Sequence, residues 1–209
     1  MDFKKGCLCV TLVTVCQQVV HFDIPPFINQ STVPKRVCFK TIGYRHMCRF
    51  QAKSLYEQPI LDGLQYVWRL DDDSYITSPV GYDVFRLMRD RRIQYGFATV
   101  VSDYGPCIVG LWPAVDDYMR QRAVRPKFRW PRGRIFWNNF ELSDLDVWRS
   151  PEYRDYIDYI DRTGGIYYHR WGDATIKTVA VTLFVPKNRT YHFKDIAYIH
   201  GRRYKPKIA

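Results

Sequence analysis

The 209-residue sequence contains no apolar run that approaches the ~18 residues of a membrane-spanning helix. It shows no repeat with a period of about 20–50 residues, which excludes a solenoid or a propeller. Glycine and proline are scarce, at 12 residues each, which excludes a collagen-like or low-complexity chain. A Gly-rich phosphate loop, a GxSxG motif and an HExxH motif are also absent.

Cysteine is also sparse, and it is not arranged as in a zinc ribbon. The six cysteines stand at positions 7, 9, 16, 38, 48 and 107. None of them forms a CxxC pair, so a structural zinc site has no support. Their density is below that of a disulfide scaffold. Buried thiols and one or two disulfides both remain compatible with this pattern.

The composition is that of a folded and strongly basic chain. Hydrophobic residues make up 46% and aromatic residues 16%, which excludes intrinsic disorder, and the length fits about one domain. The net charge of +11 favours an anionic partner. The densest basic stretch, 125–134, also carries Phe128 and Trp130. Such a stretch could bind a nucleic-acid strand, but we expect a solvated surface loop and no nucleic acid.

Strand-like and helical segments alternate along the chain, which predicts an α/β domain. We expect strands at 64–70, 93–101 and 196–200 and an irregular connection over 22–46. The β-branched stretch 10–15 favours a strand over a signal peptide. The predicted helices cover 82–92, a segment opened by Pro113, 151–163 and 173–185. The third helix has the strongest signals, with Ser150 as N-cap, Pro151 in the first turn and Gly164 after the last turn.

Five acidic or basic positions carry the candidate chemistry. Asp71 and Asp73 follow the strand 64–70, where a carboxylate pair can hold a divalent metal that neutralises a pyrophosphate. An acidic turn after a strand is also common, so these residues could equally be such a turn. Glu141 lies among aromatic residues, where a carboxylate could act as a base or a nucleophile. It could equally be a charge at a helix start or a salt-bridge partner. Asp173 is either an active-site acid or a plain N-cap. His200 ends a strand and could equally be a surface histidine.

Several ordered segments resemble one family, the fungal Golgi α-1,2-mannosyltransferases that act on cell-wall mannoproteins. Residues 44–50 read Tyr-Arg-His-Met-Cys-Arg-Phe, and residues 136–141 read Phe-Trp-Asn-Asn-Phe-Glu. Residues 168–174 read Tyr-His-Arg-Trp-Gly-Asp-Ala. Further matching stretches are 66–71, 82–85, 95–97, 111–113, 148–151, 161–165 and 198–200. The resemblance covers about residues 40–200, and ordered matches of this length are far more specific than any single motif.

The resemblance implies a glycosyltransferase A-type, Rossmann-like α/β domain with a mixed, mainly parallel sheet. It implies transfer of mannose from GDP-mannose, with retention and with Mn²⁺, to a mannosylated glycoprotein acceptor in the Golgi lumen. The implied catalytic residues are Glu141 and Asp173. The implied donor and diphosphate residues are Arg49, Asp71 and Asp73, and the implied metal ligands are His200 and Asp71. Retention would need a covalent intermediate on Glu141 or a same-face displacement, and both remain open.

The chain also departs from the family pattern. An Asp triplet replaces a Glu-Pro-Asp or Glu-Pro-Gly segment at 71–73, and Lys177 replaces a histidine. We expect a divergent strand and connection over 1–40 and a catalytic-like domain over 41–209, without a membrane anchor and without the first βα units of the family. A catalytically inactive relative that binds nucleotide, glycan or a protein partner is therefore the main alternative.

Overall fold

The computed structural model describes residues 17–201. Its α-helices are α1 (Ile42–Ala52), α2 (Val84–Asp90), α3 (Leu111–Gln121), α4 (Leu145–Arg149), α5 (Pro151–Arg162), α6 (Gly165–His169) and α7 (Asp173–Phe184). Its strands are β1 (Arg36–Val37), β2 (Lys40–Thr41), β3 (Tyr66–Leu70), β4 (Ser74–Ile76), β5 (Tyr95–Phe97), β6 (Val100–Ser102), β7 (Arg134–Phe136), β8 (Phe140–Asp144), β9 (Thr190–His192) and β10 (Tyr198–His200). Short 3₁₀ helices are η1 (Gln30–Thr32), η2 (Ser54–Glu57), η3 (Pro59–Leu61), η4 (Gly105–Cys107) and η5 (Lys187–Arg189). The strand predicted over 10–15 lies outside the described residues.

The central sheet has four strands in the order β3-β8-β5-β9. The predicted mixed sheet is confirmed, but the expectation of mainly parallel pairing is wrong. Strand β8 pairs antiparallel with both β3 and β5, and only β5 with β9 is parallel in this sheet. Because β3 and β5 both oppose β8, they run in the same direction, as a βαβ connection through α2 requires. The reversed strand β8 lies between them and makes most pairs antiparallel.

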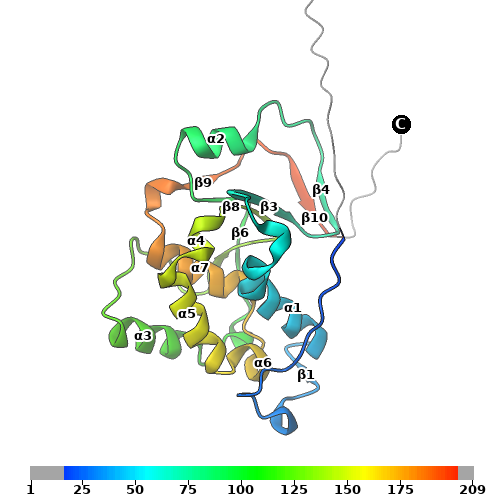
Figure 1. Cartoon of the computed structure of the whole chain (residues 1–209), viewed down its shortest axis with the longest axis vertical. Helices are drawn as coiled ribbons and strands as arrows, with labels where there is room; N and C mark the ends of the chain where they lie inside the picture. The colour runs from blue at the N-terminus through cyan, green and yellow to red at the C-terminus, as the bar shows by residue number, and fades with distance from the viewer. Residues whose placement is uncertain (1–16, 202–209) are drawn as a thin grey trace, which may run out of the picture.

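Helices cover both faces of this sheet (Figure 1). Helix α2 packs on one face, where Val84 and Met88 join Phe140, Leu142 and Phe193 in a small core. The larger core lies on the other face, with residues of α1, α3, α4, α5 and α7. Successive residues of a strand point to opposite faces of the sheet. Phe140 and Leu142 of β8 point toward α2, so Glu141 between them points toward the larger core. This alternation places a carboxylate where a buried apolar residue is usual.

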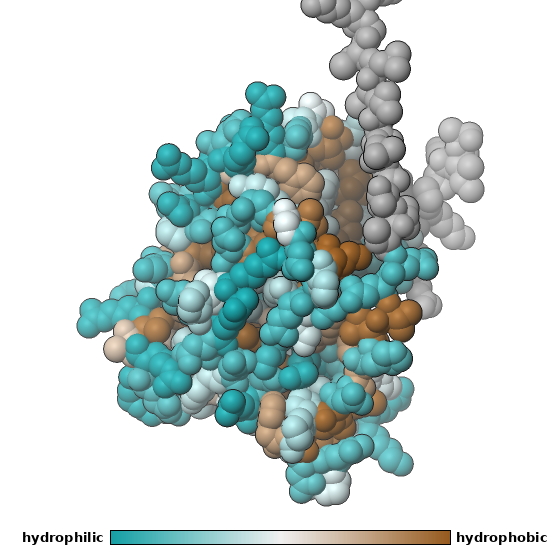
Figure 2. All heavy atoms as spheres, in the orientation of Figure 1, coloured by the Kyte–Doolittle hydropathy of each residue, from teal (hydrophilic) through white to brown (hydrophobic). Residues whose placement is uncertain are grey.

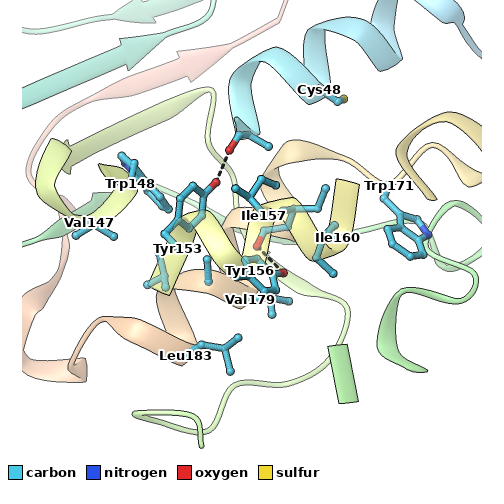
Figure 3. Packing of buried hydrophobic residues seen from close by; sticks show 14 of the residues in the cluster. Cys48, Val147, Trp148, Tyr153, Tyr156, Ile157, Ile160, Trp171, Val179 and Leu183 are labelled. Atoms are coloured by element: carbon cyan, nitrogen blue, oxygen red, sulfur yellow. Dashed lines mark hydrogen bonds between the residues drawn. The ribbon is translucent and has the colours of Figure 1, made fainter. Parts of the chain in front are cut away.

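Aromatic side chains join the helices of the larger core (Figure 3). Tyr153 and Tyr156 of α5 are almost fully buried. The Tyr153 hydroxyl donates to the carbonyl of Ala52 at the end of α1. The Tyr156 hydroxyl donates to the carbonyl of Ile176 in α7, over 3.2 Å. Each ring thus fills the core while its polar end satisfies a backbone group, which orients α1 and α7 against α5.

Helix α5 follows the sequence signals closely. The Ser150 hydroxyl accepts from the backbone N–H of Tyr153, and Pro151 stands in the first turn, both as predicted. Gly164 follows the helix with φ +76°, the left-handed conformation that glycine adopts without strain. A Cβ at this position would also lie 2.5 Å from the ring of Tyr168. The predicted start and end of this helix are confirmed.

Other boundaries differ from the expectations. The predicted strand 93–101 is divided, because β5 stays in the central sheet while β6 leaves it to pair with β7. Helix α3 begins at Leu111, so Pro113 stands inside its first turn. Backbone N–H groups in the first turn have no partner within the helix, so a proline there costs no hydrogen bond. The expected irregular connection over 22–46 holds the β1–β2 hairpin and the start of α1. Asp173 is the first residue of α7 and not its N-cap, which is Gly172.

The basic stretch 125–134 is a surface loop attached to its neighbours. Arg132 pairs with Asp116 of α3 and lies over the ring of Trp112. Trp130 packs against Phe136, with 4.5 Å between ring centroids. Hydrophilic residues cover most of the face shown in Figure 2. Within residues 17–201, no helix is long and apolar enough to cross a membrane.

Candidate active site

A cavity of about 680 Å³ opens where several strand ends and the start of α7 meet. Three of the predicted residues line it: Asp71 after β3, His200 at the end of β10 and Asp173 at the start of α7. Asp73 adjoins it through a contact with the imidazole of His200. The fold therefore brings together four positions that lie up to about 130 residues apart in the sequence, the separation between Asp71 and His200.

Pairing of β4 with β10 places His200 beside Asp73. The register sets His200 opposite Ser74, and the His200 Nδ1 lies 3.0 Å from Asp73 Oδ1 and 3.3 Å from Ser74 Oγ. The edge of the imidazole packs against Trp137. The two polar contacts, with Asp73 and Ser74, both involve Nδ1. Nε2 is therefore the nitrogen available to a metal, with the carboxylate orienting the ring as in many metal sites.

Arg69 joins the two carboxylates of the cavity floor. Its Nη1 lies 2.6 Å from Asp173 Oδ2, and its Nη2 lies 2.9 Å from Asp71 Oδ1. The amide of Asn138 donates to Asp173 as well, over 2.8 Å. Burial alone would raise the pKa of Asp173, but the guanidinium of Arg69 and the Asn138 amide together lower it. Asp173 is therefore held as a carboxylate at the wall of the cavity.

Glu141 lies beneath this floor and not in the cavity wall. It is 1% exposed and stands opposite Arg69 in the β3–β8 pair. Its Oε1 accepts from Lys177 Nζ and from Ser143 Oγ, the latter over 2.8 Å, and its Oε2 accepts from the Tyr95 hydroxyl over 3.3 Å. Burial lowers the pKa of Lys177, and the attraction of Glu141 opposes this effect. Lys177, Glu141, Arg69 and Asp173 thus alternate in sign; we call them the charge network.

Arg49 is not brought to the cavity. Its guanidinium forms a bidentate pair with Asp161 of α5, at 2.8 Å between Nη2 and Oδ2. Lys53 shares the same carboxylate over 3.0 Å. Burial lowers the pKa of Arg49, but this pairing raises it by more. Arg49 therefore ties α1 to α5 in the structure, and we leave it out of the site.

Arg69 and Asn138 lie inside the matching segments 66–71 and 136–141, and the sequence alone assigns them no role. A charged residue within the aromatic strand 66–70 is a signal for Arg69, because an arginine in a strand flanked by core needs an acidic partner. Asn139 has a second signal that only the fold reveals. Asn139 is 2% exposed in the cavity wall, and neither its Oδ1 nor its Nδ2 has a hydrogen-bond partner within residues 17–201. A buried amide without such partners in a cavity wall is a candidate group for binding a ligand.

A divalent metal fits the donor set only together with a ligand. Within the described chain, no group of three or more His, Cys, Asp or Glu side chains is close enough to hold a metal. His200 and the one-third-exposed Asp71 offer one nitrogen and one carboxylate. Hard divalent cations in nucleotide sites take few protein ligands and complete their shell with phosphate oxygens and water. The residues are therefore compatible with a metal–diphosphate complex.

Curated relatives match most of the chain. The chain is 33% identical over 204 residues to "Alpha-1,2 mannosyltransferase KTR1" of Saccharomyces cerevisiae, covering 86% of this chain and 51% of the relative. It is 32% identical over 201 residues to "Glycolipid 2-alpha-mannosyltransferase 1" of Candida albicans, covering 86% of this chain and 47% of the relative. The chain thus spans about half the length of the curated relatives it matches.

Solved structures agree with this likeness. The mannosyltransferase Ktr4p of S. cerevisiae in complex with GDP matches with a TM-score of 0.81 and 30% identity, covering 86% of this chain and 53% of that one. Core-mannan synthase A of Aspergillus fumigatus, in its Mn/GDP form, matches with a TM-score of 0.79 and 29% identity, covering 86% and 56%. The sequence profile described as "Glycolipid 2-alpha-mannosyltransferase" matches residues 18–206. The chain belongs to this glycolipid 2-alpha-mannosyltransferase family, as its sequence motifs predicted.

Proposed function

We propose that the chain is a retaining mannosyltransferase that moves mannose from GDP-mannose to a hydroxyl of a mannosylated glycoprotein, with an α-1,2 linkage. The observation that carries the proposal is the cavity that gathers Asp71, His200 and Asp173 in a chain that superposes on a GDP complex with a TM-score of 0.81. The carboxylates gathered in the cavity and the family membership favour transfer over the inactive alternative.

The diphosphate end of the cavity would be formed by Asp71 and His200, with Asp73 orienting the imidazole. The relative solved in a Mn/GDP form supports Mn²⁺ as the metal. When bound, this ion would neutralise the departing diphosphate. The amide of Asn139 would bind an oxygen of the donor, because its polar atoms are buried in the wall without a hydrogen-bond partner among the described residues.

The reaction breaks the bond between C1 of mannose and the diphosphate oxygen, and GDP leaves. The acceptor hydroxyl forms the new C1–O bond, and its proton passes to the departing diphosphate oxygen in a same-face displacement. The position of Glu141 supports this route over a covalent intermediate, since both its oxygens are engaged and it does not line the cavity. Glu141 would then act through the negative charge it holds below the floor.

The test is transfer from GDP-mannose to methyl α-mannoside with Mn²⁺, with the linkage read by NMR. We expect an α-1,2-linked product that disappears after chelation of the metal. Glu141→Gln should lower kcat by about 10²-fold, as expected for loss of an electrostatic contribution. Asp116→Asn, a half-exposed acid on α3, is the matched control and should leave kcat unchanged. Binding of GDP without any transfer would establish the inactive alternative.

We further propose that the chain works in the Golgi lumen. The disulfide between Cys38 and Cys107 supports an oxidising compartment, since such bonds rarely persist in the cytosol. Immunofluorescence of the tagged full chain against a Golgi marker tests this, and a cytosolic distribution would contradict it.

A further inference from the structure

The outer wall of the cavity contains an unusual β-turn. Strands β1 and β2 pair with Val37 opposite Lys40, so Cys38 and Phe39 form a two-residue loop. Both have positive φ, +48° and +63°. This is the region that type I′ turns reserve for Asn and Gly, and a cysteine and a phenylalanine adopt it only with steric strain. Strained backbone of this kind persists where the surrounding structure holds it, and it concentrates at ligand sites.

The strain gathers in this wall. In the described part of the chain, five non-glycine residues have positive φ: Cys38, Phe39, Arg92, Ala123 and Arg170. Three of them, Cys38, Phe39 and Arg170, line the cavity. The disulfide joins Cys38 to Cys107, 69 residues further on, and so fixes the hairpin tip to η4. The pairing of β1 with β2 and the disulfide therefore both hold the turn in place.

Two exposed aromatic rings stand on the segments that this disulfide joins. Phe39 adjoins Cys38 and is 85% exposed; Tyr104 precedes η4 and is 57% exposed. Both line the cavity, and we call them the mouth pair. Single exposed apolar side chains are common on protein surfaces. An exposed ring on a strained and cross-linked turn at a cavity mouth is different, because the fold prevents its burial.

Polar groups lie beside the mouth pair in the same wall. Lys40 lies over the ring of Tyr44, whose hydroxyl accepts from Arg170 over 3.2 Å. Arg170 in turn pairs with Asp103, the neighbour of Tyr104, over 3.4 Å. The buried Nε of Arg170 has no hydrogen-bond partner among the described residues. A ligand for this wall needs one apolar face for a ring and several hydroxyls for the charged groups.

A hexopyranose has this chemistry, because one face of its ring presents C–H groups and its edge presents hydroxyls. We propose that the mouth pair is the binding platform for the acceptor sugar, with Phe39 stacking on its C–H face and Lys40 and Asp103 meeting its hydroxyls. This inference rests on the proposed function, in which Asp71 and His200 take the diphosphate. The cross-link then keeps the platform ordered before the sugar binds, which reduces the entropy lost on binding.

Direct binding tests this inference without any need for turnover. Methyl α-mannoside is titrated into the full chain saturated with GDP and Mn²⁺, and the dissociation constant is read by NMR. Phe39→Ala should weaken mannoside binding about 3- to 10-fold. Phe39→Trp should retain it, and the double variant with Tyr104→Ala should weaken it further. Phe27→Ala is the control, since Phe27 is 49% exposed and does not line the cavity.

The affinity for GDP is measured on the same samples and should be equal in all of them. Weaker GDP binding with unchanged mannoside binding would assign the rings to the nucleotide and overturn the inference. Equal mannoside binding by all variants, or none by the natural chain, would overturn it as well. The proposed function fails differently: the natural chain then binds no GDP, or transfers no mannose.

Discussion

The floor and the mouth of the cavity are held in place by different physical means. In and beneath the floor, the charge network is buried, and each charge is held by an opposite charge or hydrogen bond at short range. At the mouth, Phe39 is exposed to water, and a disulfide and a strained turn fix its position. Burial makes the floor sensitive to the loss of one charge, whereas the mouth depends on covalent restraint. The same cavity thus combines a floor set by electrostatics with a rim set by chain geometry.

The largest expected effect is on the floor. Lys177→Met leaves the Glu141 carboxylate buried without its cation and should lower the free energy of unfolding by about 3–5 kcal/mol. Urea denaturation measures this. The double variant Lys177→Met with Glu141→Leu should recover most of the loss, because an apolar pair of similar volume replaces both charges. If Lys177→Met lowers the free energy of unfolding by less than about 1 kcal/mol, the Lys177–Glu141 pair does not stabilise the floor as described.

Removal of the disulfide is the corresponding change at the mouth. Replacing Cys38 and Cys107 by alanine should lower the free energy of unfolding by about 2–4 kcal/mol, because a long loop is released in the unfolded chain. Cys48→Ala is the control for a buried thiol outside the bond. GDP affinity should stay the same in the bridged and unbridged chains. A loss of GDP binding in the unbridged chain would mean that the mouth and the floor are not independent.

Removal of the Asp173 carboxylate from the floor is expected to have an intermediate effect on stability. Arg69 and Asn138 lower the pKa of Asp173 against the effect of burial, so its contribution to stability is complete above the ordinary carboxyl pKa of 3.8. That contribution is lost as the pH falls through the lowered pKa of the folded state. Asp173→Asn should cost about 1–2 kcal/mol at pH 7 and flatten the fall of Tm below pH 4. If Tm falls below pH 4 as steeply in Asp173→Asn as in the natural chain, the result would contradict the pairing of Asp173 with Arg69 and Asn138.

The smallest effect is expected on the solvated surface. Arg86 and Asp90 of α2 form an exposed pair at 3.5 Å, with side chains 72% and 52% exposed. Arg86→Ala should change the free energy of unfolding by at most about 0.5 kcal/mol. Chemical denaturation of this variant also calibrates the other measurements. A loss as large as that of Lys177→Met would remove the contrast between buried and exposed charges.

Local signals sufficed for some elements and failed for the site contacts. Ser150, Pro151 and Gly164 are enough to place α5, because caps and left-handed turns depend on neighbouring residues. The reversed strand β8 could not be predicted, since its place between β3 and β5 depends on pairing across about 70 residues. Their positions at strand and helix ends predict Asp71, Asp173 and His200 as site residues, and the fold brings them into one cavity. Arg49 lies outside the cavity because its guanidinium pairs with Asp161, which is 112 positions away in the sequence.

The central claim is that this cavity binds a nucleoside diphosphate together with a metal. Thermal unfolding of the full chain with GDP, with and without Mn²⁺, tests it most directly, with His200→Ala as the comparison. A ligand at 100 times its Kd stabilises the folded state by about 2.7 kcal/mol. We predict a rise in Tm that requires both GDP and Mn²⁺ and that is lost in His200→Ala. Equal Tm values in all conditions for a folded sample would contradict the assignment of this cavity as the donor site.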